Sequence, residues 1–273
     1  MKIVIPGGSG LLGTMLARSF NRDGHDVVIL TRKPRPVPWR MAAWDAQTLG
    51  NWTTEFEGAD AVINLAGRSV NCRFTQKNRR AIMDSRVNST RAVGRAIAQA
   101  ANPPRIWLQA GTATIYAHRY DASNDEFCGV IASAETDAPE TWQFSLGVAK
   151  AWENAMEESA TPRTRKVVLR ISMIMSPDGG SVFDVLLGLV RHGLGGRAGD
   201  GRQFVSWIHC EDFVRAIYWL LAHVELAGPV NLTSPGPVSN EEFMRAIREA
   251  RGASFGLPAA RWMLEIGAFF MRT

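Results

Sequence analysis

Cysteine is scarce in this sequence. The 273 residues contain three cysteines, Cys72, Cys128 and Cys210, which lie far apart along the chain. An odd number of scattered cysteines does not form a disulfide framework, and no Cys or His spacing matches a metal site. Few unpaired cysteines are typical of a reducing compartment. We therefore expect a cytoplasmic protein without a bound metal.

Long apolar runs and long blocks of one charge are also missing. No apolar run could span a bilayer, and residues 3–5 look like a strand that leaves no room for a signal peptide. The formal net charge is only +5. One predicted helix carries a basic cluster, which consists of Lys77, Arg79, Arg80, Arg86, Arg91 and Arg95. A solvated or phosphate-facing helix surface explains it better than nucleic-acid recognition. We expect neither a membrane nor a nucleic-acid partner.

Strand and helix signals alternate through the first two thirds of the chain. Short β-branched runs occupy residues 3–5, 27–30, 61–65, 106–108 and 167–171. Helical spacing occupies residues 11–21, 48–56, 76–100 and 144–158. This alternation implies right-handed βαβ crossovers, and strands this apolar are typical of a sheet covered on both faces. We predict an α/β fold in which residues 1–175 form a Rossmann-type doubly wound parallel sheet.

The character of the sequence changes after Ile171, where glycines and prolines crowd together. Helical patterns interrupt this part at residues 212–221, 240–251 and 259–270. We predict that residues 176–273 form a smaller substrate-binding lobe and that residues 206–224 return to the Rossmann domain. Such a lobe would close over the carboxyl ends of the strands, where doubly wound sheets bind ligands.

A glycine-rich turn follows the first predicted strand. Its glycines are Gly7, Gly10 and Gly13, and a helix follows from Leu11 and Leu12 onward. In dinucleotide-binding turns the first glycine permits the tight turn, the second lets the backbone approach a pyrophosphate, and the third lets helix pack on strand. The helix N-terminus then presents free N–H groups to the phosphates. A plain strand-turn-helix corner is the alternative, but strand, spacing and helix all favour a dinucleotide site.

The end of the second predicted strand indicates which dinucleotide binds. An acidic residue there would hold a ribose 2′-OH and select NAD. This chain instead has Thr31, Arg32 and Lys33, whereas Asp26 lies at the other end of the strand. A guanidinium and an ammonium suit a 2′-phosphate. The alternative is a pair of surface cations; given the turn upstream, we predict NADP(H).

These motifs together resemble a known superfamily. The matching segments are Gly7-Gly8-Ser9-Gly10-Leu11-Leu12-Gly13, Asn64-Leu65-Ala66-Gly67 and Thr112-Ala113-Thr114-Ile115-Tyr116. They are similar to the extended short-chain dehydrogenase/reductases, which include sugar-nucleotide epimerases and dehydratases. A finer resemblance is to its little-characterised epimerase-family branch, through Trp44-Asp45, Ser85-Arg86, Trp152-Glu153, residues 199–209 and residues 231–235. The resemblance implies cofactor contacts from Asp45, Leu65, Ala66 and Gly67. It also implies a C-terminal segment beyond Thr273, which relatives usually have.

The resemblance further implies a catalytic set of Ser or Thr, Tyr and Lys, with the last two spaced Tyr-x-x-x-Lys. Thr112 matches the hydroxyl position and Lys150 matches the lysine that holds the nicotinamide ribose. Leu146 stands where the tyrosine belongs, and it cannot exchange a proton. Lys150 could also be an ordinary helix lysine. Tyr116 could line the cleft, as an aromatic wall rather than a substitute acid.

The predicted smaller lobe supplies further candidates. Arg202 and Gln203 follow a glycine-rich loop and would suit an anionic or polyhydroxylated small molecule, such as a sugar nucleotide. Trp207 lies beside that loop, and we expect it near the ligand. His209 could donate a proton, but a role at the start of the next helix explains it better.

The sequence supports two functional hypotheses. The first is an NADP(H)-dependent oxidoreductase or epimerase-like enzyme with an atypical acid, which Thr112 and Lys150 favour. The second is a catalytically silent NADP(H)-sensing protein, which Leu146 favours. The elaborate motifs of the lobe favour the enzyme by analogy with the fold.

Overall fold

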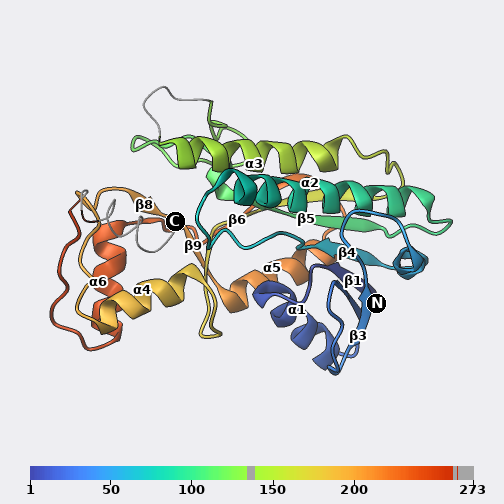
Figure 1. Cartoon of the computed structure of the whole chain (residues 1–273), viewed down its shortest axis with the longest axis horizontal. Helices are drawn as coiled ribbons and strands as arrows, with labels where there is room; N and C mark the ends of the chain where they lie inside the picture. The colour runs from blue at the N-terminus through green and yellow to red at the C-terminus, as the bar shows by residue number, and fades with distance from the viewer. Residues whose placement is uncertain (134–138, 261–262, 264–273) are drawn as a thin grey trace. The chain divides into compact units, whose positions relative to one another are not determined.

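The computed structural model describes residues 1–133, 139–260 and 263 (Figure 1). Contacts divide the chain into two compact units. The first unit comprises Met1–Val70, Thr75–Ile171 and Val214–Asn231. The second comprises Asn71–Phe74, Ser172–Phe213 and the described residues from Leu232 onward.

The first unit is built on a seven-stranded sheet. Its members, in spatial order, are β10 (Gly228–Leu232), β6 (Arg165–Ile171), β5 (Ile106–Thr112), β4 (Ala61–Asn64), β1 (Lys2–Pro6), β2 (Asp26–Thr31) and β3 (Arg40–Ala43). All neighbours from β6 to β3 pair in parallel. In register, Pro6 lies opposite Leu30 and Asn64 opposite Gln109, so these strands end at one edge of the sheet. The predicted Rossmann-type α/β fold is confirmed.

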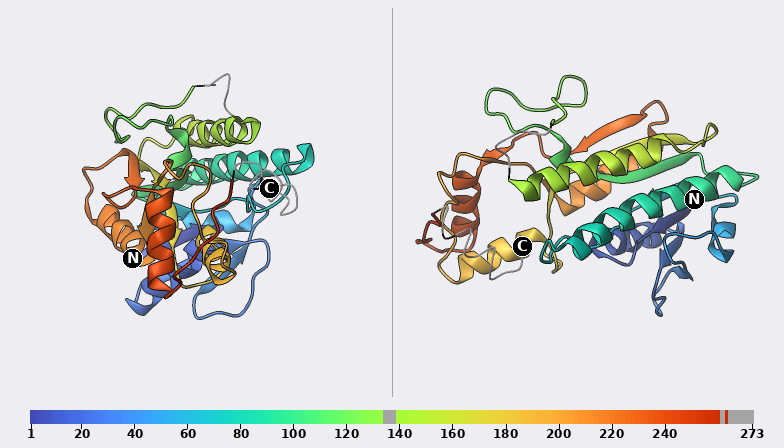
Figure 2. Two further views of the ribbon diagram at one scale, coloured as in Figure 1. Left: turned by 90° about the vertical axis from the view of Figure 1, so that its left-hand side faces the viewer. Right: turned by 45° about the horizontal axis from the view of Figure 1, so that its top comes forward.

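Helices cover both faces of this sheet (Figure 1). The helices α2 (Gln76–Gln99) and α3 (Glu140–Glu157) run side by side on one face (Figure 2). On the other face lies α1 (Leu11–Arg22), and its Phe20 packs against Tyr218 of α5 (Cys210–Ala222). The central strands are largely apolar because neither face meets water; Ile3, Ile63 and Leu108, for example, are fully buried.

The segment between β2 and β4 differs from the prediction. A helix was expected over residues 48–56, but the structure has a short 3-10 helix there, η1 (Asn51–Phe56). The strand β3, which precedes it, was not predicted. The spacing of Trp52 and Phe56 that resembled an α-helix instead lets both rings contact each other edge-on, with Trp52 also meeting Trp44. Aromatic packing therefore produced the periodic pattern.

The second unit contains two small sheets. In one, β7 (Met173–Met175) pairs in parallel with β9 (Trp207–His209), and in the other β8 (Phe204–Val205) pairs antiparallel with β11 (Val238–Ser239). The helices α4 (Val182–Arg191) and α6 (Asn240–Ala250) each begin with a capping box and bury an apolar face in this unit's core. The helix α4 was not predicted from the sequence. The helix predicted over residues 259–270 falls almost entirely outside the described residues.

No helix in the described part of the chain is long and apolar enough to cross a bilayer.

Candidate functional site

The glycine turn joins β1 to α1, and its glycines differ in what they do. Gly7 has a φ of +72°, which favours glycine, and a Cβ there would collide with the backbone of Ala66. A Cβ on Gly13 would collide with the backbone of Gly8, where the helix packs on the turn. Gly10 has an ordinary φ of −82°, and a Cβ there would meet no atom within 4 Å. The fold thus requires Gly7 and Gly13, whereas Gly10 leaves open space beside the backbone.

The N-terminus of α1 faces this open space without a cap. Gly10 is the N-cap residue and contributes no side-chain hydrogen bond, and the first turn holds no acidic residue. The N–H groups of Leu11, Leu12 and Gly13 have no partner within a helix that starts here. They carry the positive end of the helix dipole. This arrangement fits a phosphate group.

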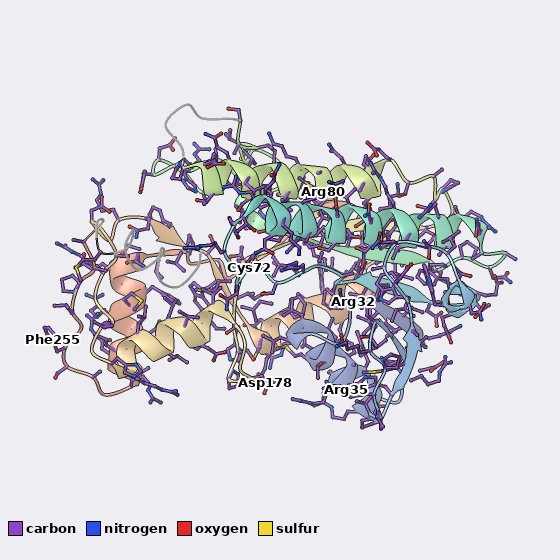
Figure 3. The ribbon with its side chains drawn as sticks, in the orientation of Figure 1. Arg32, Arg35, Cys72, Arg80, Asp178 and Phe255 are labelled. Atoms are coloured by element: carbon purple, nitrogen blue, oxygen red, sulfur yellow. The ribbon has the colours of Figure 1, made fainter. Side chains whose placement is uncertain are left out.

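The end of β2 lies next to the turn through a chain of hydrogen bonds. The Thr31 hydroxyl donates to Ser9 Oγ over 3.1 Å and accepts the backbone N–H of Lys33 over 3.4 Å. The side chains of Arg32 and Lys33 are exposed and make no hydrogen bond or ion pair with any residue that the structure describes. The side chains of Arg32 and Arg35 extend from this segment (Figure 3). Two unneutralised cations therefore follow the strand that is tied to the glycine turn.

The segment after β4 lies at the same edge. The fully buried Asn64 donates from Nδ2 to Gln109 Oε1 over 2.9 Å and accepts the Ala66 N–H at Oδ1 over 3.1 Å. These bonds hold Leu65 and Ala66 where Ala66 meets Gly7. The structure thus brings together three predicted cofactor segments: the turn, the end of β2 and residues 65–67.

Ser85 and Arg86 on α2 hold the next residue of this segment. Ser85 Oγ accepts the N–H of Arg68 over 3.0 Å, and Arg86 Nη1 donates to the Arg68 carbonyl over 3.1 Å. The Arg86 guanidinium lies over the ring of Trp152, 4.9 Å from the ring centroid. Burial lowers the pKa of Arg86 to about 10. The Ser-Arg pair is recognisable in the sequence only through the family resemblance, because no local pattern reveals contacts with Arg68.

Asp45 has a local structural function. Its Oδ1 accepts the N–H groups of Gln47 and Thr48, each over 2.8 Å, and its Oδ2 accepts the Thr48 hydroxyl over 2.6 Å. The bonds from Thr48 and Gln47 hold the pKa of Asp45 below its usual value. The cofactor contact that we expected from Asp45 stays a prediction.

Thr112 is the last residue of β5, and Tyr116 follows it after one 3-10 turn, η2 (Ala113–Ile115). Thr112 Oγ1 donates to Thr114 Oγ1 over 3.0 Å and accepts the Thr114 N–H over 3.2 Å. The buried Tyr116 hydroxyl donates to Asn231 Oδ1 over 2.9 Å and accepts from Arg170 Nη1 over 2.8 Å. A phenol that already donates its proton to an amide is poorly placed to protonate a substrate. The geometry therefore favours a structural role for Tyr116.

Helix α3 carries the lysine of the predicted catalytic set. Lys150 is partly buried and makes no hydrogen bond or ion pair with any described residue. Glu153, three residues on, is paired with Arg170 over 2.9 Å and so does not neutralise Lys150. One turn before the lysine, Leu146 is 4% exposed and packs with Tyr116 in an apolar cluster. An ammonium is thus available at this position, and a tyrosine is not.

The lobe candidates all lie in the second unit. Gln203 Nε2 donates to the Ala198 carbonyl over 2.9 Å, and Trp207 Nε1 donates to the Gly236 carbonyl over 3.2 Å. The Arg202 N–H donates to Asp200 Oδ1 over 3.0 Å. As expected, His209 precedes a helix start, where its Nδ1 accepts the Glu211 N–H over 3.3 Å. These bonds shape the loop; ligand contacts from Arg202, Gln203 and Trp207 stay predictions.

Among the described residues, no group of three or more His, Cys, Asp and Glu side chains could hold a metal ion.

Comparison with known proteins places the chain in a family. Residues 3–232 match the model of the NAD dependent epimerase/dehydratase family. The chain is 30% identical over 267 residues to the epimerase family protein YfhF of Bacillus subtilis, covering 97% of this chain and 84% of that protein. It is 31% identical over 267 residues to the epimerase family protein SDR39U1 of Bos taurus, covering 95% and 84% respectively.

Among solved structures, the human epimerase family protein SDR39U1 with NADPH superposes with a TM-score of 0.83 at 27% identity. The match covers 97% of this chain and 85% of that one. Sequence and fold agree over nearly the whole chain, and this chain therefore belongs to the NAD dependent epimerase/dehydratase family.

Proposed function

We propose that this protein binds NADP(H) at the glycine turn and uses it as an oxidoreductase or epimerase-like enzyme on a small molecule. The main support is structural: the uncapped N-terminus of α1 lies close to the segment that bears two unneutralised cations, Arg32 and Lys33. The turn suits the pyrophosphate, and the cations suit a 2′-phosphate, which NAD lacks. The human relative bound to NADPH supports the same cofactor.

The residues near the expected nicotinamide position define what this chain can contribute. The bound cofactor supplies or accepts the hydride. The free ammonium of Lys150 would hold the nicotinamide ribose and serve as the proton donor, because Leu146 cannot do so. The Thr112 hydroxyl, oriented by Thr114, would position the substrate. A small molecule that is anionic or resembles a sugar nucleotide would suit Arg202 and Gln203.

A catalytically silent NADP(H) sensor is the second candidate. Two observations favour it: Leu146 is buried in an apolar cluster, and the Tyr116 phenol is already hydrogen-bonded to Asn231 and Arg170. A sensor would retain the cofactor groups and need no acid.

The two candidates predict different results with Lys150→Met. General acid catalysis is typically worth about a hundredfold to ten-thousandfold. For the enzyme, NADPH oxidation with a panel of carbonyl compounds and sugar nucleotides should fall by that factor at saturating NADPH. The exposed Lys77→Met is the matched control and should leave the rate unchanged. If wild type oxidises NADPH with none of these substrates, the sensor is favoured; equal rates in wild type and Lys150→Met would refute the role of Lys150.

A further inference from the structure

The guanidinium of Arg86 has one occupied edge and one free edge. Its Nη1 donates to the carbonyl oxygens of Arg68 and Ile82, over 3.1 and 3.2 Å. Its Nε and Nη2 have no hydrogen-bond partner among the described residues, and no described carboxylate pairs with this arginine. The free edge therefore keeps the two parallel N–H groups with which arginine binds a carboxylate or a phosphate.

Gly67 lies against one face of this guanidinium. The residue is exposed, and a Cβ built on it would lie 3.3 Å from Cζ and 3.5 Å from Nη2 of Arg86. Its φ lies outside the positive range in which glycine is favoured, so the turn itself does not require glycine here. What the missing side chain provides is room for the face of the guanidinium beside the chain, while the Nε–Nη2 edge stays free.

The rest of the surroundings hold Arg86 in place without neutralising it. The ring of Trp152 lies under the guanidinium, and Trp152 Nε1 donates to Thr90 Oγ1 over 3.1 Å. Thr90 Oγ1 in turn donates to the Arg86 carbonyl over 2.8 Å. The carboxylate of Glu153, the next residue after Trp152 in the chain, is paired with Arg170. A cation that is desolvated, fixed and unpaired is suited to binding a charged ligand.

We propose that Arg86 binds an anionic oxygen of the substrate, from a carboxylate or a phosphate, with this free edge. The guanidinium lies beside the segment that follows β4, at the sheet edge where doubly wound folds bind ligands. This inference rests on the proposed function, since it assumes a substrate beside the cofactor. The substrate would then be an anion, and Arg86 of α2 would recognise its charged group.

The test uses inorganic pyrophosphate and oxalate as probes, each titrated by calorimetry into the full chain saturated with NADPH. Gly67→Ala places a methyl group 3.3 Å from Cζ of Arg86, on the face of the guanidinium, and so displaces the free edge without removing the charge. Arg86→Lys keeps the charge but loses the two-pronged donor. Arg68→Gln removes an equal charge from the same segment and serves as the matched control. Melting temperatures show whether each variant is folded.

We expect wild type to bind at least one probe, and Gly67→Ala and Arg86→Lys to weaken it by about tenfold to a hundredfold. Arg68→Gln should change the affinity less than about twofold, because the exposed Arg68 side chain donates to Asn78. The preferred probe distinguishes a carboxylate from a phosphate substrate.

Two results would overturn the proposal: no binding of either probe to wild type, or unchanged affinity in a folded Arg86→Lys. A separate titration with NADPH alone, monitored by nicotinamide fluorescence, measures the affinity of the cofactor site. Failure of that titration counts against the proposed function, whereas failure of the probes alone counts against Arg86.

Discussion

Gly10→Val should separate cofactor binding from folding. A Cβ at Gly10 meets no atom within 4 Å, and its φ of −82° and ψ of −178° suit valine. Replacing glycine at a helix N-cap costs roughly 1 kcal/mol or less here, because no side-chain cap is lost. The valine side chain would occupy the space through which a pyrophosphate approaches the N–H groups of α1. We expect NADPH affinity to fall at least about a hundredfold, which equals about 2.7 kcal/mol.

Gly13→Ala is the contrasting variant. Its Cβ would collide with the backbone of Gly8, which cannot rotate away as a side chain can. Overpacking of this kind costs about 1–3 kcal/mol, and each kcal/mol lowers the melting temperature by roughly 2–4 °C in a protein near this size. NADPH fluorescence titration, far-UV circular dichroism and thermal melting distinguish the two effects. Normal NADPH binding by a folded Gly10→Val would refute this account of the turn.

Three further predictions concern Thr31, Leu146 and Glu153. Thr31→Val removes the bond to Ser9 and should lower the NADPH-over-NADH preference by about twofold to tenfold; unchanged ratios of the two dissociation constants would argue against the link. Leu146→Tyr places a larger ring in a packed cluster and should lower the free energy of unfolding in urea by about 1–3 kcal/mol; a variant as stable as wild type would show room for the missing tyrosine. Glu153→Ala leaves Arg170 buried without its carboxylate and should lower the same free energy by about 3–5 kcal/mol; a loss below about 1 kcal/mol would show that water compensates.

The strands and the glycine turn could be predicted from sequence because their signals are local. Apolar β-branched runs mark strands that are covered on both faces, and the structure has strands at every predicted run. The helix after the turn was likewise recognisable from its spacing. The edge strand β3, exposed at Arg40 and Ala43, lacks such a run and was missed.

The polar contacts around the site could not be predicted, because they join distant residues. Tyr116 donates a hydrogen bond to Asn231, which lies 115 positions away in the chain. Burial strengthens this hydrogen bond, but no local sequence pattern indicates it. Burial by itself lowers the pKa of Arg170, yet its bonds to Glu153 and Tyr116 raise it overall. The hydrogen bonds that join the side chains of Ser85 and Arg86 to the backbone of Arg68 are likewise visible only in the structure.

The relative affinities for NADPH and NADH show whether the cations after β2 bind a 2′-phosphate. Wild-type protein should be titrated with NADPH and with NADH under identical salt and pH, with Arg32→Ala measured beside it. The contact of Arg32 with a 2′-phosphate predicts that NADPH binds about tenfold to a hundredfold more tightly and that Arg32→Ala loses most of this preference. Equal affinity of wild type for the two cofactors would contradict the NADP(H) site.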